Sequence, residues 1–317
     1  MTTIRQPMTF RDEANNRASA PKWLEKKKFI KQQSNDKKCF HSNKVTLFSK
    51  VNKPDSKWYF KRYKRSTPPY EYEACASDFY RFILGKERAA KAQAVSKYGN
   101  IVGIISQHNP AGFESILDIT NKPGLRNFAL TPRNGYCEVE MAEAVLNEVD
   151  GVDNPGNVGF NRNDEISRID YNLSFFYGTA FIGNLSKNES LIHDTKDDNV
   201  IQRFYKAALK IIMLNDDNVI KTILERHVID PKIAAELSRV ILMNTKTLRQ
   251  DFMQSERFKT FMLNFDNKEL FIEIEDFFKH ERTHASSRFD DCLASIKATY
   301  AQITAACTPS KATAITL

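Results

Sequence analysis

Long apolar runs are missing from this 317-residue chain. No stretch approaches the roughly 18 consecutive apolar residues that a membrane-spanning helix needs, and the polar N-terminus lacks the hydrophobic core of a signal peptide. The five cysteines have neither metal-ligand spacing nor the even number of a disulfide set. The sequence therefore predicts a protein of a reducing compartment, the cytoplasm, with enough apolar residues to bury a substantial core.

Glycine is scarce where a phosphate-binding loop would use it. Residues 32–43, which precede the first clear pair of β-prone segments, contain none. A glycine-rich loop lets backbone N–H groups approach phosphates closely, whereas the Ser and Asn side chains present here can still donate hydrogen bonds. A phosphate-binding loop at this place would therefore have to rely on those side chains.

Positive charge is concentrated near the N-terminus. Residues 1–70 hold 18 Lys and Arg against 5 Asp and Glu, a surplus of 13, and residues 22–31 suggest an amphipathic helix with a lysine face. Such a surplus is either a solvated face or a site for a polyanion: an inositol polyphosphate first, then a phosphoinositide membrane surface. Nucleic acid ranks last, because no nucleic-acid-binding motif accompanies the charge. The anion-binding candidates are Lys26, Lys27, Lys28, Lys31, Lys37, Lys38, Arg62 and Arg65.

Asp170 and Asn157 flank a predicted β-hairpin. Residues 158–160 and 166–169 are β-prone, and the turn residues 161–165 separate them. The two polar residues therefore reach the same end of the hairpin, where a carboxylate and an amide can hold a divalent metal that carries nucleotide phosphates. The alternative is that both are ordinary turn residues.

Lys61 and Glu73 form a second pair of candidates. Lys61 lies in the β-prone segment 58–63, and a helix is predicted over 70–84, after Ser and Pro residues typical of a helix start and before Gly85. Glu73 borders the buried face of this helix and can meet Lys61, whereas Glu71 shares a side with Asp78 and is expected to be more solvated. Alone, each would more often be a surface residue; their order favours a phosphate-binding lysine and its orienting glutamate.

The middle of the chain extends this plan. Residues 92–97 and 100–105 are predicted strands, and the segment from Ile104 to His108 is a candidate for the hinge whose backbone binds adenine in kinase folds. The nucleotide-binding candidates are Lys61, Ile104, Ile105, Ser106 and Gln107. An amphipathic helix over 137–149 then leads to Asp150 and Asp153.

The order of these segments resembles the atypical kinases of the phosphoinositide-kinase and HipA-like branch, most of all the kinase-like effectors that Legionella species inject into host cells. The resemblance covers about residues 40–180 and implies phosphate contact by Lys61, with Glu73 as its partner, and metal ligation by Asn157 and Asp170. The family places its catalytic Asp five residues before the Asn, where this chain has Val152. Asp153 is therefore the preferred catalytic base and Asp150 the alternative.

Beyond residue 175 the periodicity of apolar residues predicts helices over 199–214, 230–243, 245–264 and 268–300. The predicted organisation is a basic extension (1–40), a kinase-like N-lobe (41–109), a helical C-lobe (110–303) and a tail or linker (304–317).

These patterns and the resemblance together predict an α+β fold with two kinase-like lobes, a small antiparallel sheet with one helix and a larger helical lobe. The expected function is ATP-dependent phosphoryl transfer to a protein or phosphoinositide hydroxyl, with Mg²⁺ or Mn²⁺ and under control of an inositol polyphosphate or a membrane. The alternatives are a pseudokinase that only binds, and AMP transfer on the same fold. The resemblance also implies secretion into a host cell and a host protein as partner.

Overall fold

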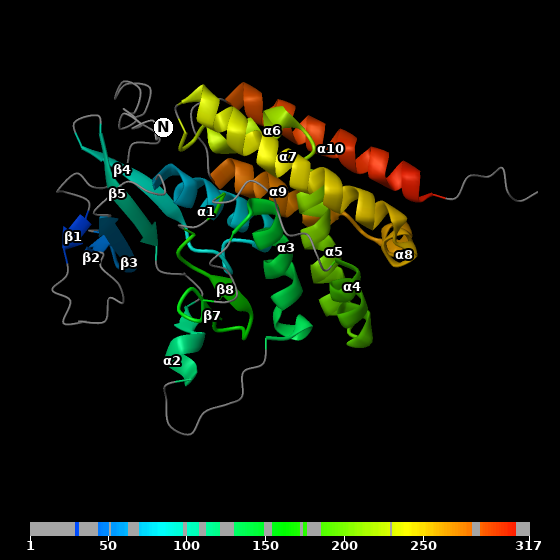
Figure 1. Cartoon of the computed structure of the whole chain (residues 1–317), viewed down its shortest axis with the longest axis horizontal. Helices are drawn as coiled ribbons and strands as arrows, with labels where there is room; N and C mark the ends of the chain where they lie inside the picture. The colour runs from blue at the N-terminus through cyan, green and yellow to red at the C-terminus, as the bar shows by residue number, and fades with distance from the viewer. Residues whose placement is uncertain are drawn as a thin grey trace, which may run out of the picture.

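The computed structural model describes residues 29–31, 44–50, 52–62, 70–97, 100–107, 112–120, 130–148, 154–171, 174–175, 185–228, 230–280 and 286–308. They form a mixed α and β structure with two antiparallel sheets. Figure 1 shows the larger sheet at one end of the molecule, the long C-terminal helices at the other, and helix α1 between them. The α+β class predicted from the sequence is confirmed.

The larger sheet has the strand order β1-β2-β3-β5-β4, and all its neighbours are antiparallel. Its strands are β1 (Phe29–Lys31), β2 (Lys44–Lys50), β3 (Lys53–Arg62), β4 (Ala92–Lys97) and β5 (Asn100–Gln107). The predicted strands around Lys61 and over 92–105 are confirmed. The predicted helix over 22–31 is wrong for residues 29–31, which extend the sheet by pairing with β2. Because Phe29 and Ile30 are β-prone, pairing with an open sheet edge outweighs helical periodicity there.

Strand β5 approaches β3 very closely beside Lys61. A Cβ atom built on Gly103 would lie 2.5 Å from the backbone oxygen of Lys61 and 2.6 Å from the Phe60 ring. No side chain fits in that space, so glycine is needed for the two strands to lie together at this point.

Helix α1 (Tyr70–Leu84) is the central element of the fold, and every residue in it except Arg81 is buried. It packs against β4 and β5 on one side and against the helical part of the molecule on the other (Figure 1). The chain leaves it at Gly85 with φ +89°, as the predicted helix end requires. Glu71, expected to be more solvated than Glu73, is buried as well, and so is Asp78, because helices cover the side of α1 that the sheet leaves free.

Asp78 fixes α1 to the helical part. Its Oδ2 atom accepts hydrogen bonds from Arg226 at 3.0 Å and His227 at 2.9 Å, both just beyond α6 (Asp217–Leu224). Burial alone would raise the pKa of Asp78, but the charges of His227 and Arg226 outweigh it and hold the pKa well below its ordinary value. Asp78 is therefore ionised at neutral pH and forms a buried link between α1 and α6.

The smaller sheet contains the predicted hairpin. Its strands are β6 (Glu114–Ser115), β7 (Val158–Phe160) and β8 (Ile166–Arg168), in the order β6-β7-β8, and α2 (Ile116–Thr120) follows β6 directly. The Asn161 side chain shapes the hairpin turn, since its Oδ1 atom accepts from the backbone N–H groups of Asn163 at 2.9 Å and Glu165 at 3.0 Å.

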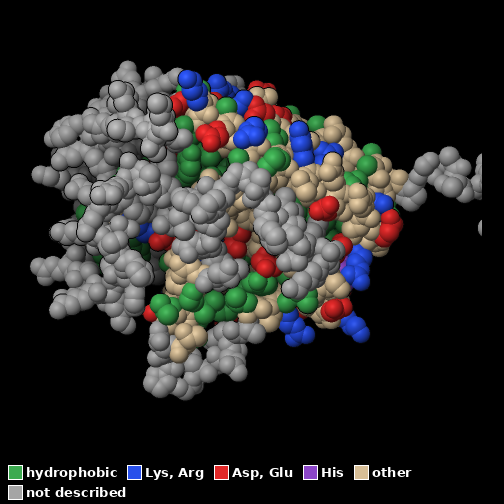
Figure 2. All heavy atoms as spheres, in the orientation of Figure 1, with side chains coloured by type: hydrophobic (Ala, Val, Ile, Leu, Met, Phe, Trp, Pro, Cys, Tyr) green, Lys and Arg blue, Asp and Glu red, His purple; other side chains and the backbone are tan. Residues whose placement is uncertain are grey.

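The remaining helices pack into the largest core of the molecule. They are α3 (Tyr136–Leu146), preceded by a 3-10 turn (Pro132–Asn134), α4 (Leu185–Asp194), α5 (Asp198–Ile212), α7 (Pro231–Gln254), α8 (Glu256–Asn264), α9 (Lys268–His280) and α10 (Ser286–Cys307). Figure 2 shows acidic and basic side chains interspersed over the surface of this part. Within the described ranges, none of the helices combines the length and the apolar composition that crossing a bilayer requires.

Three predicted helix boundaries are wrong. Helix α7 continues past residue 243 to Gln254. Ser255 separates it from α8, because the Ser255 side chain accepts a hydrogen bond from the Phe258 N–H and so caps the start of α8. The predicted helix over 268–300 is two helices, α9 and α10. The tail predicted from residue 304 begins later, since α10 buries Ile303 and Cys307 and runs to the latter.

Candidate functional site

Lys61 lies near the end of β3, in the interior of the larger sheet. Its backbone pairs with Val45 of β2 on one side and with Ile104 of β5 on the other. The side chain is 14% exposed, so its ammonium group lies at the edge of solvent and not within it.

Glu73 holds this lysine from helix α1. Lys61 Nζ donates to Glu73 Oε1 at 3.2 Å, and the Glu73 side chain is 1% exposed. A carboxylate buried to this extent needs a charged partner, which Lys61 supplies. The predicted contact between Lys61 and Glu73 is therefore confirmed.

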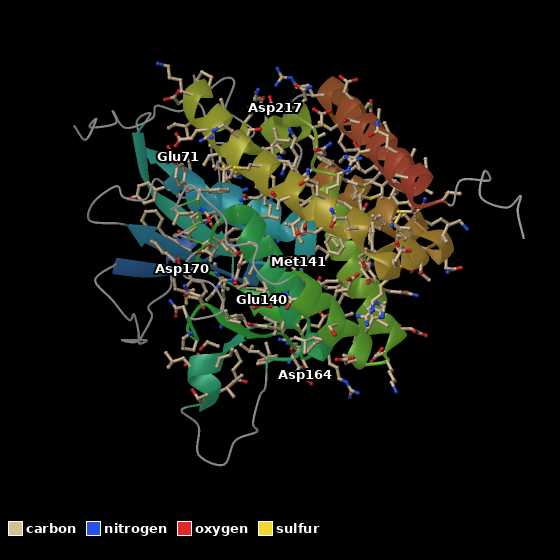
Figure 3. The ribbon with its side chains drawn as sticks, turned by 45° about the vertical axis from the view of Figure 1, so that its right-hand side comes forward. Glu71, Glu140, Met141, Asp164, Asp170 and Asp217 are labelled. Carbon is tan, nitrogen blue, oxygen red and sulfur yellow. The ribbon has the colours of Figure 1, made fainter. Side chains whose placement is uncertain are left out.

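Asp170 approaches the same lysine from the smaller sheet. Its Oδ1 atom lies 2.8 Å from Lys61 Nζ, and its side chain is 30% exposed. Asp170 directly follows the β8 region, and its φ of +58° is uncommon for a residue other than glycine. Its carboxylate reaches a strand of the larger sheet, and Figure 3 shows Asp170 beside these strands. Lys61, Glu73 and Asp170 thus join three elements that are distant in the sequence; we call them the lysine triad.

The charge state of the lysine triad follows from these distances. Burial alone would lower the pKa of Lys61, but the charges of Asp170 and Glu73, and their hydrogen bonds, outweigh burial and raise it above its ordinary value. Lys61 is therefore a cation at neutral pH, shared by two carboxylates.

Asn157 lies at the same end of the hairpin as Asp170, as predicted. Its backbone oxygen accepts from the N–H of Ile169 at 3.0 Å, which brings the two ends of the hairpin together. Its backbone N–H donates to Asn154 O at 2.9 Å, in a turn that directly precedes β7. Asp150 and Asp153, the candidates for the catalytic base, lie outside the described residues.

The oxygen donors at this hairpin end suit a hard divalent cation. Mg²⁺ is usually held by one or two protein carboxylates together with substrate phosphates, and Asp170 and Asn157 supply a carboxylate and an amide. Among the described residues, no group of three or more His, Cys, Asp or Glu side chains forms an all-protein metal site. The residues present therefore fit a metal that arrives with phosphates.

The hinge candidates occupy a different position from the one expected. Ile104, Ile105, Ser106 and Gln107 belong to β5, where Ile104 and Ile105 pair with β3 on one side and β4 on the other. The Gln107 N–H donates to Lys91 O at 2.7 Å. The backbone of Ile104 and Ile105 is therefore used within the sheet and is not free to bind adenine, and the strand runs further than its β-prone sequence suggested. His108 lies outside the described residues.

The side chains of the anion-binding candidates lie outside the described part of the structure. Lys31 and Arg62 have described backbones in β1 and β3, and the other six lie outside the described residues.

Sequence reasoning missed Arg168, the residue two positions before Asp170. Its side chain is fully buried, and it lies 3.3 Å from Glu143 Oε1 and 4.0 Å from Glu148 Oε2. The sequence did offer an indication of this buried charge: Arg168 is an arginine in a β-prone segment of otherwise core-like residues, two positions before the candidate metal ligand.

No protein-family model matches the chain, and no curated protein matches it.

Proposed function

We propose that this protein is an ATP-dependent phosphotransferase with a kinase-like arrangement of two lobes. The observation that carries the proposal is the lysine triad: Lys61 from the larger sheet contacts Glu73 of α1 at 3.2 Å and Asp170 of the smaller sheet at 2.8 Å. Kinase folds hold nucleotide phosphates with a strand lysine that a helix glutamate orients, and with a nearby carboxylate that binds the metal.

Each residue of the site has a defined task in this proposal. Lys61 donates to phosphate oxygens, and Glu73 keeps its ammonium group pointed at them. Asp170 and Asn157 hold Mg²⁺ or Mn²⁺, which neutralises phosphate charge when bound. Asp153, or alternatively Asp150, accepts the proton of the acceptor hydroxyl, on a protein or a phosphoinositide.

The lysine triad also suggests how metal and nucleotide arrive. A divalent cation at Asp170 would lie beside the positive charge of Lys61, and the repulsion opposes binding of metal alone. Negatively charged phosphate oxygens placed between the two cations attract both the metal and the Lys61 ammonium group, and so outweigh the repulsion between them. We therefore expect the metal and ATP to bind together and more tightly than either alone.

The basic surplus of residues 1–70 supports an anionic regulator. An inositol polyphosphate or a phosphoinositide headgroup carries the clustered phosphates that so many Lys and Arg side chains attract.

Transfer of labelled phosphate tests the proposed reaction. The full chain is incubated with ATP labelled at the γ- or the α-phosphate, with Mg²⁺ or Mn²⁺, and label is followed into protein and inorganic phosphate. We expect label from the γ-position only, in reactions that EDTA abolishes. Lys61→Met should lower the rate at least about tenfold, equivalent to about 1.4 kcal/mol.

Lys57→Met is the matched control, because Lys57 is an exposed lysine on the same strand. It should retain the wild-type rate. Label from the α-position would show AMP transfer instead. If no labelled phosphate is released or transferred in the presence of metal, the proposed catalysis is wrong and the protein at most binds nucleotide.

A further inference from the structure

Among the residues that the structure describes, Arg168 is the largest side chain that is completely buried, with 0% exposure, and it comes two residues before Asp170. Its backbone is held by the segment 88–90: its N–H donates to Arg88 O at 2.8 Å, and its carbonyl accepts from the Ala90 N–H at 3.2 Å. The position of β8 is therefore well fixed where the chain turns toward Asp170.

The guanidinium group of Arg168 pairs with two carboxylates at the C-terminal end of α3. Its Nε atom lies 3.3 Å from Glu143 Oε1, within α3, and its Nη2 atom lies 4.0 Å from Glu148 Oε2, two residues past the end of that helix. In the sequence, residue 148 is followed within five positions by Asp150 and Asp153. Arg168 thus connects the strand before the candidate metal ligand with the helix before the candidate catalytic base.

Neighbouring groups hold the chain on the far side of Asp170 to the same cluster. The Tyr171 hydroxyl donates to Arg168 O at 2.8 Å, and its ring stacks on Tyr80 of α1 with ring centroids 4.7 Å apart. The Ser174 hydroxyl donates to Glu148. Asp170 is therefore the partly exposed member of a segment anchored both before and after it.

Stability alone does not explain a charged cluster in this place. Removing an arginine and its carboxylates from water costs several kcal/mol per ion, and well-packed apolar residues of similar volume are often at least as stabilising. A buried ion pair can instead be retained for conformational specificity, because separating its charges inside the protein is costly. A buried arginine with defined partners is therefore suited to holding β8 at a fixed position relative to α3.

We propose that Arg168 is a positioning residue that sets the location of the Asp170 carboxylate relative to the end of α3. The inference rests on the proposed function and deepens it: Arg168 acts on the metal-bound form of the nucleotide through Asp170, without touching the ligand. Groups that orient metal ligands in this way typically contribute about 10- to 100-fold to metal affinity.

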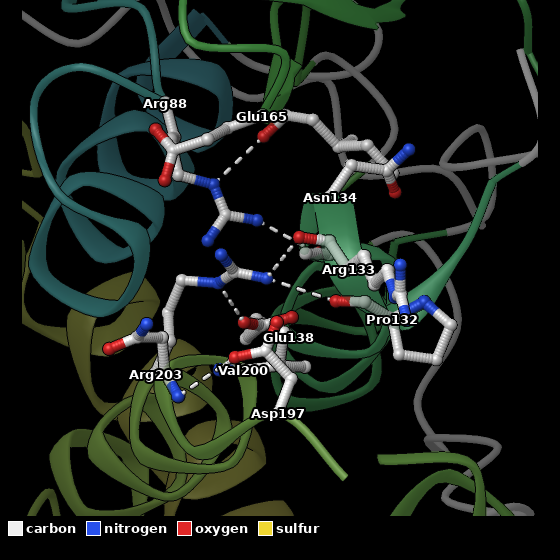
Figure 4. Close-up of polar contacts among 12 residues, drawn as sticks. Arg88, Pro132, Arg133, Asn134, Glu138, Glu165, Asp197, Val200 and Arg203 are labelled. Atoms are coloured by element: carbon white, nitrogen blue, oxygen red, sulfur yellow. Dashed lines mark hydrogen bonds and ion pairs between the residues drawn. The ribbon is translucent and has the colours of Figure 1, made fainter. Parts of the chain in front are cut away.

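Arg203 of α5 provides a matched control, because it also pairs with a glutamate of α3. Its Nε atom donates to Glu138 Oε1 at 2.6 Å near the start of α3, and its Nη2 atom donates to Pro132 O and Arg133 O, each at 2.9 Å (Figure 4). Arg168→Met and Arg203→Met therefore each remove an arginine that pairs with a glutamate of α3, but only Arg168 is next to Asp170.

The test measures the affinity of each full-length variant for Mn²⁺·ATP and for ATP in EDTA by calorimetry, at a temperature where circular dichroism shows every variant folded. Arg168→Met should weaken Mn²⁺·ATP binding at least about tenfold and change binding of metal-free ATP less than about twofold. Arg168→Lys, which keeps the charge, should recover part of the loss. Arg203→Met should bind Mn²⁺·ATP like the wild type.

The outcomes separate the inference from the proposed function. An equal loss in Arg168→Met and Arg203→Met, or an equal loss of metal-free ATP binding, overturns the positioning role while the proposed function stands. If the wild type binds no Mn²⁺·ATP, the proposed function fails and the inference with it. If Arg168→Met does not fold, Glu148→Gln takes its place and should weaken only the metal-bound form; unchanged affinity would then overturn the inference.

Discussion

Replacing Asp170 with Asn should lower metal-dependent phosphoryl transfer at least about 100-fold, equivalent to about 2.7 kcal/mol of transition-state stabilisation. The substitution removes the carboxylate that fits the metal and leaves Lys61 paired with Glu73 alone. Asn tolerates the positive φ of this position, so the backbone is kept. The rate of γ-phosphate release or transfer is measured at saturating metal and ATP.

Asp164→Asn is the control for this experiment. Asp164 lies on the same hairpin with φ +57°, almost the same as the +58° of Asp170, but it is exposed and far from the lysine triad (Figure 3). The two substitutions change charge and backbone preference equally. If both variants lose activity to the same extent, or if Asp170→Asn keeps more than a tenth of the wild-type rate, the candidate site is misplaced.

Replacing Asp78 with Ala should lower the free energy of unfolding by about 3–5 kcal/mol, because it leaves the buried side chains of Arg226 and His227 without their shared carboxylate. Urea unfolding followed by circular dichroism measures the loss. Glu225→Gln is the neighbouring control. It breaks an exposed ion pair with Arg288 and should cost less than about 1 kcal/mol.

The ion pair of Asp78 with Arg226 and His227 also makes the free energy of unfolding depend on pH. Because the pKa of Asp78 is lowered in the folded state, its contribution is fully present above the ordinary pKa of an aspartate, about 4, and is lost as pH falls from there toward the folded pKa. The wild type should therefore lose stability below pH 4 more steeply than Asp78→Ala does. Parallel losses in the two proteins, or a cost of Asp78→Ala below 1 kcal/mol at neutral pH, would show that the link is not stabilising.

The contact between Lys61 and Glu73 could be predicted because local patterns carry it. Lys61 lies in a β-prone segment, and a helix with a clear start and stop follows it; helical periodicity puts Glu73 at the border of the buried face, and the order of the two segments suggests that they meet. The hairpin that brings Asn157 and Asp170 to one end was predictable for the same reason, since its turn residues are adjacent in the sequence.

The contact between Lys61 and Asp170 was not predicted, because it depends on how the two sheets are placed relative to each other. Burial of Asp78 and Arg168 also depends on partners far away in the chain, Arg226 for one and Glu143 for the other. A charged residue on a helix or strand normally indicates the solvent side, and only tertiary packing reverses that expectation. The hinge assignment is wrong for Ile104 and Ile105, because the end of a strand depends on which neighbours continue beside it.

The most direct test of the lysine triad as a metal–nucleotide site is a calorimetric titration of the full-length wild type with Mn²⁺ alone, with ATP in EDTA, and with Mn²⁺·ATP. Because the Lys61 ammonium lies 2.8 Å from Asp170, metal and phosphate should each need the other. We expect Mn²⁺·ATP to bind at least about tenfold more tightly than either component, a difference of about 1.4 kcal/mol. Absence of saturable Mn²⁺·ATP binding, or equally tight binding of Mn²⁺ alone, would contradict the account.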